Sequence, residues 1–205
     1  MAKVSQVTSR AGITLNDTGN TSWTEPELLA WFNDGVRDTI QLDPSAKSKH
    51  AALTLVEGGR QQMPADFVTL IDVVCNINED NTSGEQIYFA DKRQLDAFQP
   101  KWLSGSTKEK IENVLYDRRD RKTFYVYPPA AAGIKIEVVH SYFPTTVTNV
   151  NDDLPLDDDY LTPLLDYLLW RAYSKDSKNP AYKVKAETHF AAYQAAVAAI
   201  VKSKE

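Results

Sequence analysis

Cysteine, histidine and excess positive charge are all scarce in this chain of 205 residues. The single cysteine, Cys75, excludes an intrachain disulfide and a zinc site built on several cysteines. The three histidines, His50, His140 and His189, do not occur at the spacing of a metal-binding pair. Lysine and arginine total 23 against 28 acidic residues, a net charge of −5, which disfavours tight binding to nucleic-acid phosphates or to an anionic membrane. We therefore expect no metal and no cofactor.

Long apolar runs and recognisable nucleophile motifs are missing as well. No run approaches the roughly 20 residues of a membrane-spanning helix, and residues 1–14 lack the apolar core of a signal peptide. The serines stand in no GxSxG or SxxK context. These absences predict a cytosolic protein that is not an enzyme. A hydrolase that uses paired aspartates stays open, because the sequence does not place two carboxylates across a cleft.

Helical periodicity marks both ends of the chain. Near the N-terminus, apolar residues at helical spacing run from Leu28 to Ile40, behind an expected capping box of Thr24 and Glu27. Near the C-terminus, one helix is expected to carry Leu161 to Tyr173, with Asp157 or Asp158 as its cap. Asn179-Pro180 is expected to open a second helix, because asparagine caps well and proline suits the first turn.

Between residues 51 and 143 the pattern changes to that of strands. We expect strands over 52–56, 72–77, 113–116, 123–127 and 134–142, a hairpin turn over 117–122, and a short helix over 91–98 capped by Asp91. Pro128, Pro129 and Gly133 are expected to separate the last two strands. Since consecutive elements usually pack together, we predict an α+β fold. A discontinuous helical bundle, 1–50 and 155–205, would carry an inserted antiparallel β module over 51–150.

Two side-chain groups stand out as candidates for contacts. Five carboxylates gather in the acidic segment 152–159, where the simplest interpretation is a solvated linker whose last aspartates favour the positive end of the following helix. Aromatic residues exceed what a core of this size needs, with four tryptophans and ten tyrosines. The candidates for subunit or partner interfaces are Trp102, Tyr142, Phe143, Trp170 and Tyr182. Packing between the two parts of the chain is the equal alternative.

Several segments form a distinctive ordered set along the chain: 23–24 (WT), 27–35 (ELLAWFNDG), 43–46 (DPSA), Gly59 with 61–64 (QQMP), 99–102 (QPKW), 117–119 (DRR), 124–129 (FYVYPP) and 166–176 (DYLLWRAYSKD). In this order the segments resemble phage adaptor proteins, the head-to-tail connectors of tailed bacteriophages. The resemblance implies a structural virion protein, assembled in the host cytoplasm, that combines a helical bundle with a β portion. It also implies a ring of twelve subunits beneath the portal protein, which continues the DNA channel without sequence-specific binding and offers a platform to the tail nozzle.

In similar proteins the C-terminal segment often reaches the portal. Residues 175–205 of this chain carry six lysines against three acidic residues, so we expect this segment to dock on an acidic portal surface. The residues expected to make the contact are Lys183, Lys185, Phe190, Tyr193, Val197, Lys202 and Lys204. In a ring, carboxylates facing the channel would repel DNA phosphates. The expected channel-facing residues are Asp152, Asp153, Asp157 and Asp158.

Two other structural functions remain open from the sequence. A tail-completion or tail-terminator protein would bind the tail tube, whereas an adaptor would bind the portal. A carbohydrate-binding module would hold sugar through Trp102, Tyr125 and Tyr127, which all lie in the expected β module.

Overall fold

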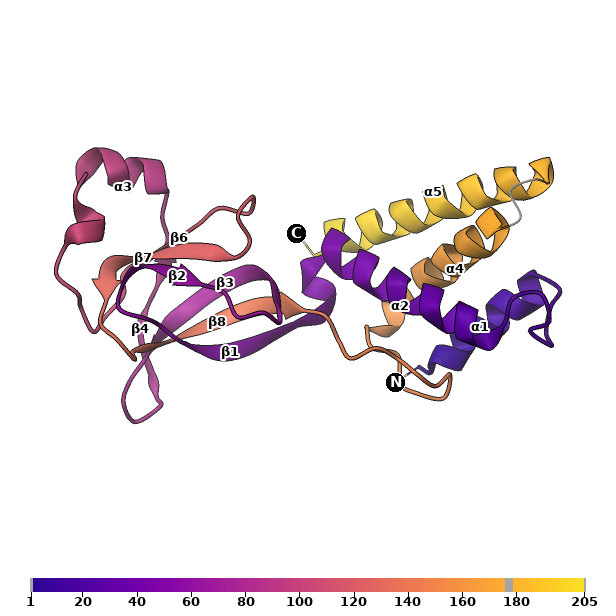
Figure 1. Cartoon of the computed structure of the whole chain (residues 1–205), viewed down its shortest axis with the longest axis horizontal. Helices are drawn as coiled ribbons and strands as arrows, with labels where there is room; N and C mark the ends of the chain where they lie inside the picture. The colour runs from indigo at the N-terminus through magenta and orange to yellow at the C-terminus, as the bar shows by residue number, and fades with distance from the viewer. Residues whose placement is uncertain (1, 176–178, 205) are drawn as a thin grey trace. The chain divides into compact units, whose positions relative to one another are not determined.

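The computed structural model describes residues 2–175 and 179–204, and the chain divides into two compact units (Figure 1). Residues 1–46 and 144–205 form a helical unit, and residues 47–143 form a strand unit. Helices occur at both ends of the chain and two four-stranded sheets lie between them, so the predicted α+β class is confirmed. Within the described residues, none of the helices is long and apolar enough to cross a lipid bilayer.

The helical unit contains α1 (Val4–Thr14), α2 (Glu25–Leu42), α4 (Leu161–Lys175) and α5 (Pro180–Lys202). The predicted stripe on α2 is buried, and Phe32 and Ile40 are fully enclosed. Gly35 lies on the same side of α2, where a Cβ atom would approach the Tyr167 ring to 2.8 Å. Glycine therefore lets α2 and α4 pack more closely than any other residue would.

The expected capping box at the start of α2 is wrong. Thr24 takes the N-cap position without a side-chain hydrogen bond, and the Glu27 carboxylate lies 2.7 Å from Lys175 Nζ on α4. The preceding loop is held instead by Asp17, whose carboxylate accepts the backbone amides of Thr21, Ser22 and Trp23 at 2.8–3.0 Å. Glu27 is thus used between helices rather than within one.

Of the other expected helix caps, two are present and one is absent. Asn179 accepts the Ala181 amide at 3.0 Å, and Asp91 accepts the Arg93 amide at 2.7 Å, so these caps are confirmed. Asp157 precedes a single 3₁₀ turn (Asp158–Tyr160) and makes no side-chain cap. The expected aspartate cap of α4 is therefore wrong.

The strand unit holds two sheets. One has the strand order β1 (Ser48–Thr54), β8 (Lys135–Tyr142), β3 (Phe67–Ile77) and β4 (Ser83–Gln86); the other has β2 (Gly58–Gln62), β7 (Thr123–Ala130), β6 (Asn113–Tyr116) and β5 (Tyr88–Phe89). The predicted hairpin joins β6 to β7. Strands β4 and β5 were not predicted, and β5 pairs parallel with β6. The module is therefore mixed rather than purely antiparallel.

One apolar cluster fills the strand unit and draws on both sheets. Leu70 and Val138 come from one sheet, and Val114 and Val126 from the other. Buried and more exposed residues alternate along β2 and over most of β8, as the period of a pleated strand requires. The short α3 (Lys92–Phe98) and a 3₁₀ turn (Trp102–Ser104) follow β5 in this unit (Figure 1).

Strand β7 continues through Pro128 and Pro129, where the sequence predicts a break. Its partner β2 shifts register between Gly58, which faces Ala130, and Arg60, which faces Tyr125. The two prolines lie in that interruption. Because a bulge needs no amide donor from the residues that it skips, proline is tolerated there.

Candidate assembly surface of the C-terminal helix

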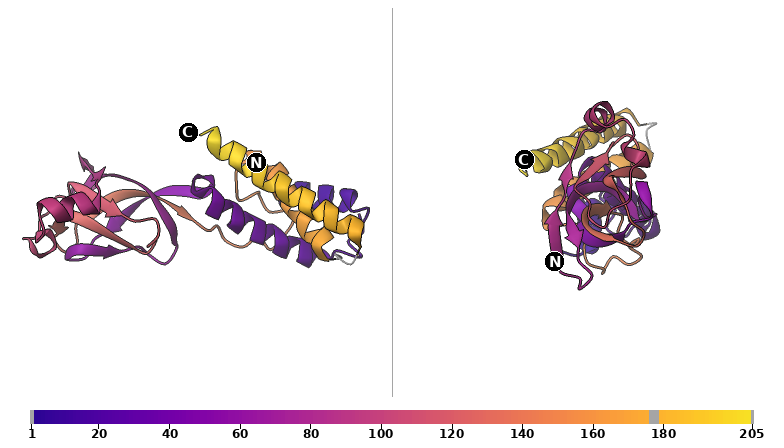
Figure 2. Two further views of the ribbon diagram at one scale, coloured as in Figure 1. Left: turned by 90° about the horizontal axis from the view of Figure 1, so that it is seen from above. Right: turned by 90° about the vertical axis from the view of Figure 1, so that its left-hand side faces the viewer.

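The inner side of α5 fixes this helix to the rest of the helical unit. Ala186, Tyr193 and Val197 are buried, and α5 runs alongside α4 and part of α2 (Figure 2). The Tyr193 hydroxyl donates to Asp38 at 2.9 Å and lies 3.2 Å from the Thr39 hydroxyl. Burial raises the pKa of Tyr193, so its hydroxyl stays protonated and keeps this role.

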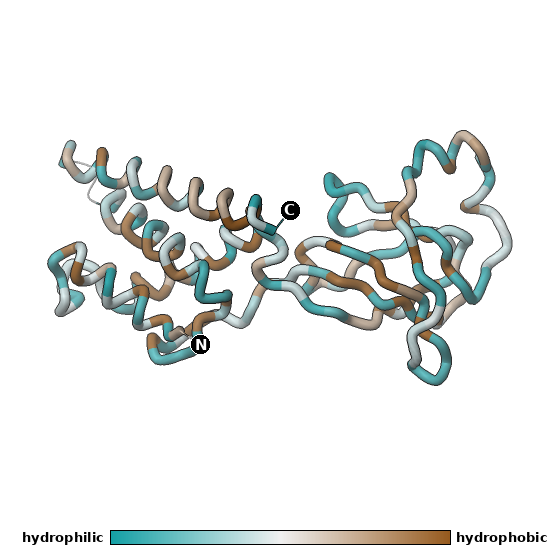
Figure 3. Tube along the Cα trace, turned by 180° about the vertical axis from the view of Figure 1, so that it is seen from behind, coloured by the Kyte–Doolittle hydropathy of each residue, from teal (hydrophilic) through white to brown (hydrophobic). Residues whose placement is uncertain are grey.

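The outer side of α5 is rich in alanine. Val184 is 62% exposed, and six alanines are exposed beside it: Ala181, Ala191, Ala192, Ala195, Ala198 and Ala199. Hydrophilic residues lie mainly toward the two ends of the helix (Figure 3). Glu187, Thr188 and Gln194 are exposed among these residues, so the exposed side is alanine-rich and only weakly polar. An alanine-rich side of this kind is suited to close packing against a second protein surface.

The cations of α5 flank this alanine-rich side. Lys183, Lys185 and Lys202 are exposed, as a docking function requires. Lys185 also lies over the ring of Tyr173, with Nζ 5.1 Å from the ring centroid. Of the apolar residues predicted for docking, Phe190 packs half-buried against Trp170 with ring centroids 4.5 Å apart. Tyr193 and Val197 face inward and act by holding the helix in place. Asp176, Lys178 and Glu205 lie outside the described residues.

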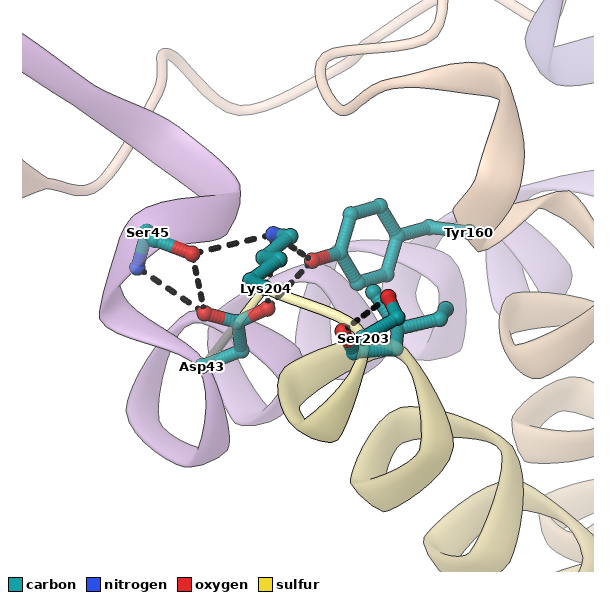
Figure 4. A network of polar contacts seen from close by, with 6 residues as sticks. Asp43, Ser45, Tyr160, Ser203 and Lys204 are labelled. Atoms are coloured by element: carbon teal, nitrogen blue, oxygen red, sulfur yellow. Dashed lines mark hydrogen bonds and ion pairs between the residues drawn. The ribbon is translucent and has the colours of Figure 1, made fainter.

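Lys204 is engaged within the chain, in a polar cluster that closes the end of the helical unit (Figure 4). Its ammonium donates to Asp43 at 3.0 Å, to the Ser45 hydroxyl at 2.9 Å and to the Tyr160 hydroxyl at 2.9 Å. Tyr160 and Ser45 each donate to Asp43 as well. The C-terminal end of α5 is thereby tied to the residues that follow α2.

The electrostatics of this cluster explain why a carboxylate is stable there. The Asp43 side chain is only 4% exposed. Burial opposes its ionisation, but the hydrogen bonds from Ser45, Tyr160 and Lys204 outweigh that penalty and lower its pKa. Burial, and next the hydrogen bond to Asp43, raise the pKa of Tyr160, which stays a donor. The cluster is therefore a set of mutually hydrogen-bonded groups that connects α5 to the end of α2. The sequence does not reveal it, because Asp43 and Lys204 are 161 positions apart.

The acidic segment is used mainly to hold the N-terminus. Asp153 lies 2.6 Å from Lys3 Nζ, and Asp158 accepts the Ala2 amide at 3.1 Å. Asp152 accepts the Asn149 amide at 3.2 Å. All of the predicted channel-facing carboxylates, Asp157 included, are exposed. The segment is thus a surface connection with local structural roles.

Most of the aromatic candidates pack inside their own units. Trp170 contacts Tyr167 and Phe190, and Tyr182 lies against Tyr173. Tyr142 is half-buried beneath Lys49 Nζ at 4.7 Å, and Phe143 is half-buried.

The position of Trp102 argues against the sugar-binding hypothesis. It is only 4% exposed and donates its indole N–H to Asp96 at 2.9 Å. Tyr125 and Tyr127 meet it at interplanar angles of 76° and 72°. A stacking platform for a sugar needs an open ring face, and the buried Trp102 does not provide one.

The described residues offer little for catalysis. They contain no group of three or more histidine, cysteine or acidic side chains placed to hold a metal ion. Cys75 is buried in β3, where it acts as a small core residue. His189 is paired with Asp166 at 2.8 Å on the inner side of α5, stacked on Tyr173. These contacts favour structural roles for residues that would otherwise be candidate nucleophiles or bases.

Comparison with known proteins agrees with this picture of a structural protein. No curated protein sequence matches the chain. The family model described as SU10 adaptor protein matches residues 2–205. The match spans both units and reaches the α5 surface described above. The chain therefore belongs to the SU10 adaptor family of phage structural proteins.

Proposed function

We propose that this protein is the head-to-tail adaptor of a tailed bacteriophage. In this proposal twelve copies form a ring beneath the portal protein, continue the DNA channel and present a platform to the tail nozzle. The observation that carries the proposal is the match of the SU10 adaptor family model to nearly the whole chain. The exposed, alanine-rich side of α5 supports it, because small apolar side chains allow another protein surface to pack closely against the helix.

The proposed portal contact is the exposed cationic part of α5. Lys183 and Lys185 lie in its first two turns and Lys202 lies in its last turn. Their partner would be an acidic surface, and such a contact weakens as salt screens the charges. Lys204 would take part only if it left Asp43, because it is held by three hydrogen bonds in the isolated chain.

For the DNA channel, we propose a minor role for the acidic segment. Asp157 is exposed, and in a ring its carboxylate would repel the phosphates of passing DNA if it faced the lumen. Asp153 and Asp158 are held by Lys3 and the Ala2 amide, and this fixes the segment in place. A map of the assembled ring with these side chains outside the lumen would remove this part of the proposal.

A capture experiment with the portal protein of the same phage tests the main proposal. Tagged portal should retain the wild-type chain at low salt, and the triple variant Lys183→Glu, Lys185→Glu, Lys202→Glu should be retained at least about tenfold less. The matched control carries the same charge reversal on the strand unit, at the exposed residues Lys101, Lys108 and Lys135. Equal retention of both triple variants would refute the role of the α5 lysines.

The same experiment separates the adaptor from a tail-terminator protein. With tagged tail-tube protein as bait, an adaptor should not be retained in the absence of the portal. Retention by the tube and not by the portal would replace the proposed function with the terminator function.

A further inference from the structure

An apolar groove lies at the C-terminal ends of α2 and α5. It has a volume of about 420 Å³, and its lining residues are Leu42, Gln194, Val197, Ala198, Val201 and Lys202. Leu42 is 49% exposed although it is a large apolar residue. Lys202 is the charged residue of the lining. The α5 groove therefore suits an apolar side chain that has an acidic neighbour.

The helical unit carries such a side chain elsewhere. Ile13, in the last turn of α1, is 67% exposed. Glu25 borders the same small surface hollow as Ile13. Asp17 lies in the following loop, and backbone amides, that of Trp23 above all, lower its pKa and keep it ionised. With Arg10 as the cation of this stretch, residues 10–25 carry two negative charges against one positive.

The other exposed apolar residue of α5 fits the groove less well. Val184 is 62% exposed, but Lys183 and Lys185 flank it directly. These ammonium groups would meet Lys202 at the groove, and like charges brought together oppose association. Charge complementarity therefore selects Ile13 over Val184.

We infer that Ile13 of one copy inserts into the α5 groove of a second copy, with Glu25 placed toward Lys202. This inference rests on the proposed function, because it names the contact by which adaptor subunits join. Glu25 begins α2 and Leu42 ends it, a separation of about 25 Å at 1.5 Å per residue. One chain therefore cannot fill its own groove. A contact between two different patches is heterologous, and repeated contacts of this kind form a ring when the rotation between successive copies closes.

Disulfide trapping between two differently marked chains tests the contact directly. In a Cys75→Ser background, an Ile13→Cys chain is mixed with a Leu42→Cys chain and oxidised at the highest soluble concentration. Mass spectrometry then counts the linked peptides. The 13–42 linkage should exceed its statistical share relative to 13–13 and 42–42 linkages. A 13–42 linkage at or below that share would overturn the inference.

Charge exchange provides a second readout that leaves the apolar residues intact. Lys202→Glu in the Leu42→Cys chain should lower the 13–42 yield about threefold, the size expected for one exposed ion pair. Glu25→Lys in the Ile13→Cys chain should restore it. Failure of this restoration would also count against the inference.

A control tests whether another exposed apolar residue occupies the groove instead. Phe98 and Val56 of the strand unit are 84% and 61% exposed. In otherwise identical mixtures, a Phe98→Cys or a Val56→Cys chain replaces the Ile13→Cys chain. Preferential linkage of residue 42 to either position would overturn the assignment to Ile13. Lys202 takes part in both proposed contacts, so the reading that separates them is capture of the wild-type chain by the portal, which uses no Lys202 variant. Absence of portal binding by the wild-type chain would refute the proposed function. A 13–42 yield at the statistical share would refute only this contact between copies.

Discussion

Helices α2 and α5 lie in the same unit but use their surfaces differently. Helix α2 has one apolar stripe, which includes Phe32 and Val36, and this stripe is buried against its neighbours. Helix α5 buries Tyr193 and Val197 on one side and leaves an alanine-rich side exposed. The stripe of α2 is thus accounted for by folding of one chain, whereas Leu42 at the end of the helix stays 49% exposed. The exposed alanines of α5 favour the helix by their propensity, and in the proposed assembly they also pack against a second protein surface.

This difference indicates that the residues that determine stability and those that determine assembly are separate on these two helices. Substitutions on α2 and on the inner side of α5 should alter the free energy of unfolding. Substitutions on the outer side of α5 should leave that free energy nearly unchanged and alter association.

Phe32→Ala should destabilise the isolated chain most. Phe32 is fully buried in the α2 stripe, and removal of a buried phenyl ring costs about 3–5 kcal/mol because it leaves a cavity. Urea unfolding followed by circular dichroism measures the loss. Gln41→Ala, at an exposed position of the same helix, is the control. A Phe32→Ala chain as stable as the control would show that the α2 stripe does not determine stability.

Lys204→Met should lower stability by about 1 kcal/mol at neutral pH, because it removes a charged donor from buried Asp43. The Lys204 side chain is 40% exposed, so water offsets part of the loss. Thermal unfolding of this variant measures it. Lys202→Met, at the neighbouring exposed lysine, serves as the control and should change stability much less.

Asp43→Asn tests the same cluster through pH. The pKa of Asp43 is lower in the folded chain than its ordinary value of 3.8. Its stabilisation is therefore present above about pH 3.8 and is lost as the pH falls through the folded-state pKa. The stability gap between wild type and Asp43→Asn should narrow over that acid range. A gap that stays constant would contradict an ionised Asp43 in the folded state.

Tyr193→Phe should have a smaller effect, about 0.5–1.5 kcal/mol, because it removes one hydroxyl and keeps the ring. That hydroxyl bridges Asp38 and Thr39 of α2. Urea unfolding compares it with Tyr182→Phe, whose ring lies half-buried against Tyr173. Equal destabilisation by both changes would mean that the α5 to α2 hydrogen bonds contribute nothing specific.

Ala195→Glu should have the smallest effect on stability, within about 0.5 kcal/mol, because the position is exposed and glutamate is a good helix former. Its effect on assembly should be large, because a charge would enter an apolar contact. Sedimentation of the chain with portal protein measures assembly. Unimpaired assembly would show that the alanine-rich side is not an interface.

The helices were predictable from the sequence because their information is local. The apolar spacing of α2 and the Asn179-Pro180 start of α5 are visible within a few turns. The Lys204 to Asp43 contact was not predictable, because neither residue has a local pattern that points to the other. Thr24 and Glu27 illustrate the opposite error, since a good local signal was outcompeted by the Lys175 ion pair.

The strand unit was less predictable for a related reason. Short strands such as β5, only two residues long, have no measurable alternation. Pro128 and Pro129 predict a break in the strand, because proline has no amide to donate. A register shift between β2 and β7 instead accommodates both prolines within β7. Among the candidate interface aromatics, the sequence does not distinguish the buried Trp102 from the half-buried Tyr142, Phe143, Trp170 and Tyr182.

Lysine acylation with and without the portal protein tests the central claim most directly. Mass spectrometry reports the labelling of Lys183, Lys185 and Lys202 on α5, with Lys101 and Lys135 of the strand unit as exposed references. If the outer side of α5 is an assembly surface, labelling of the α5 lysines should fall on assembly while that of the references persists. Unchanged labelling of all three α5 lysines in an assembled complex would contradict the account.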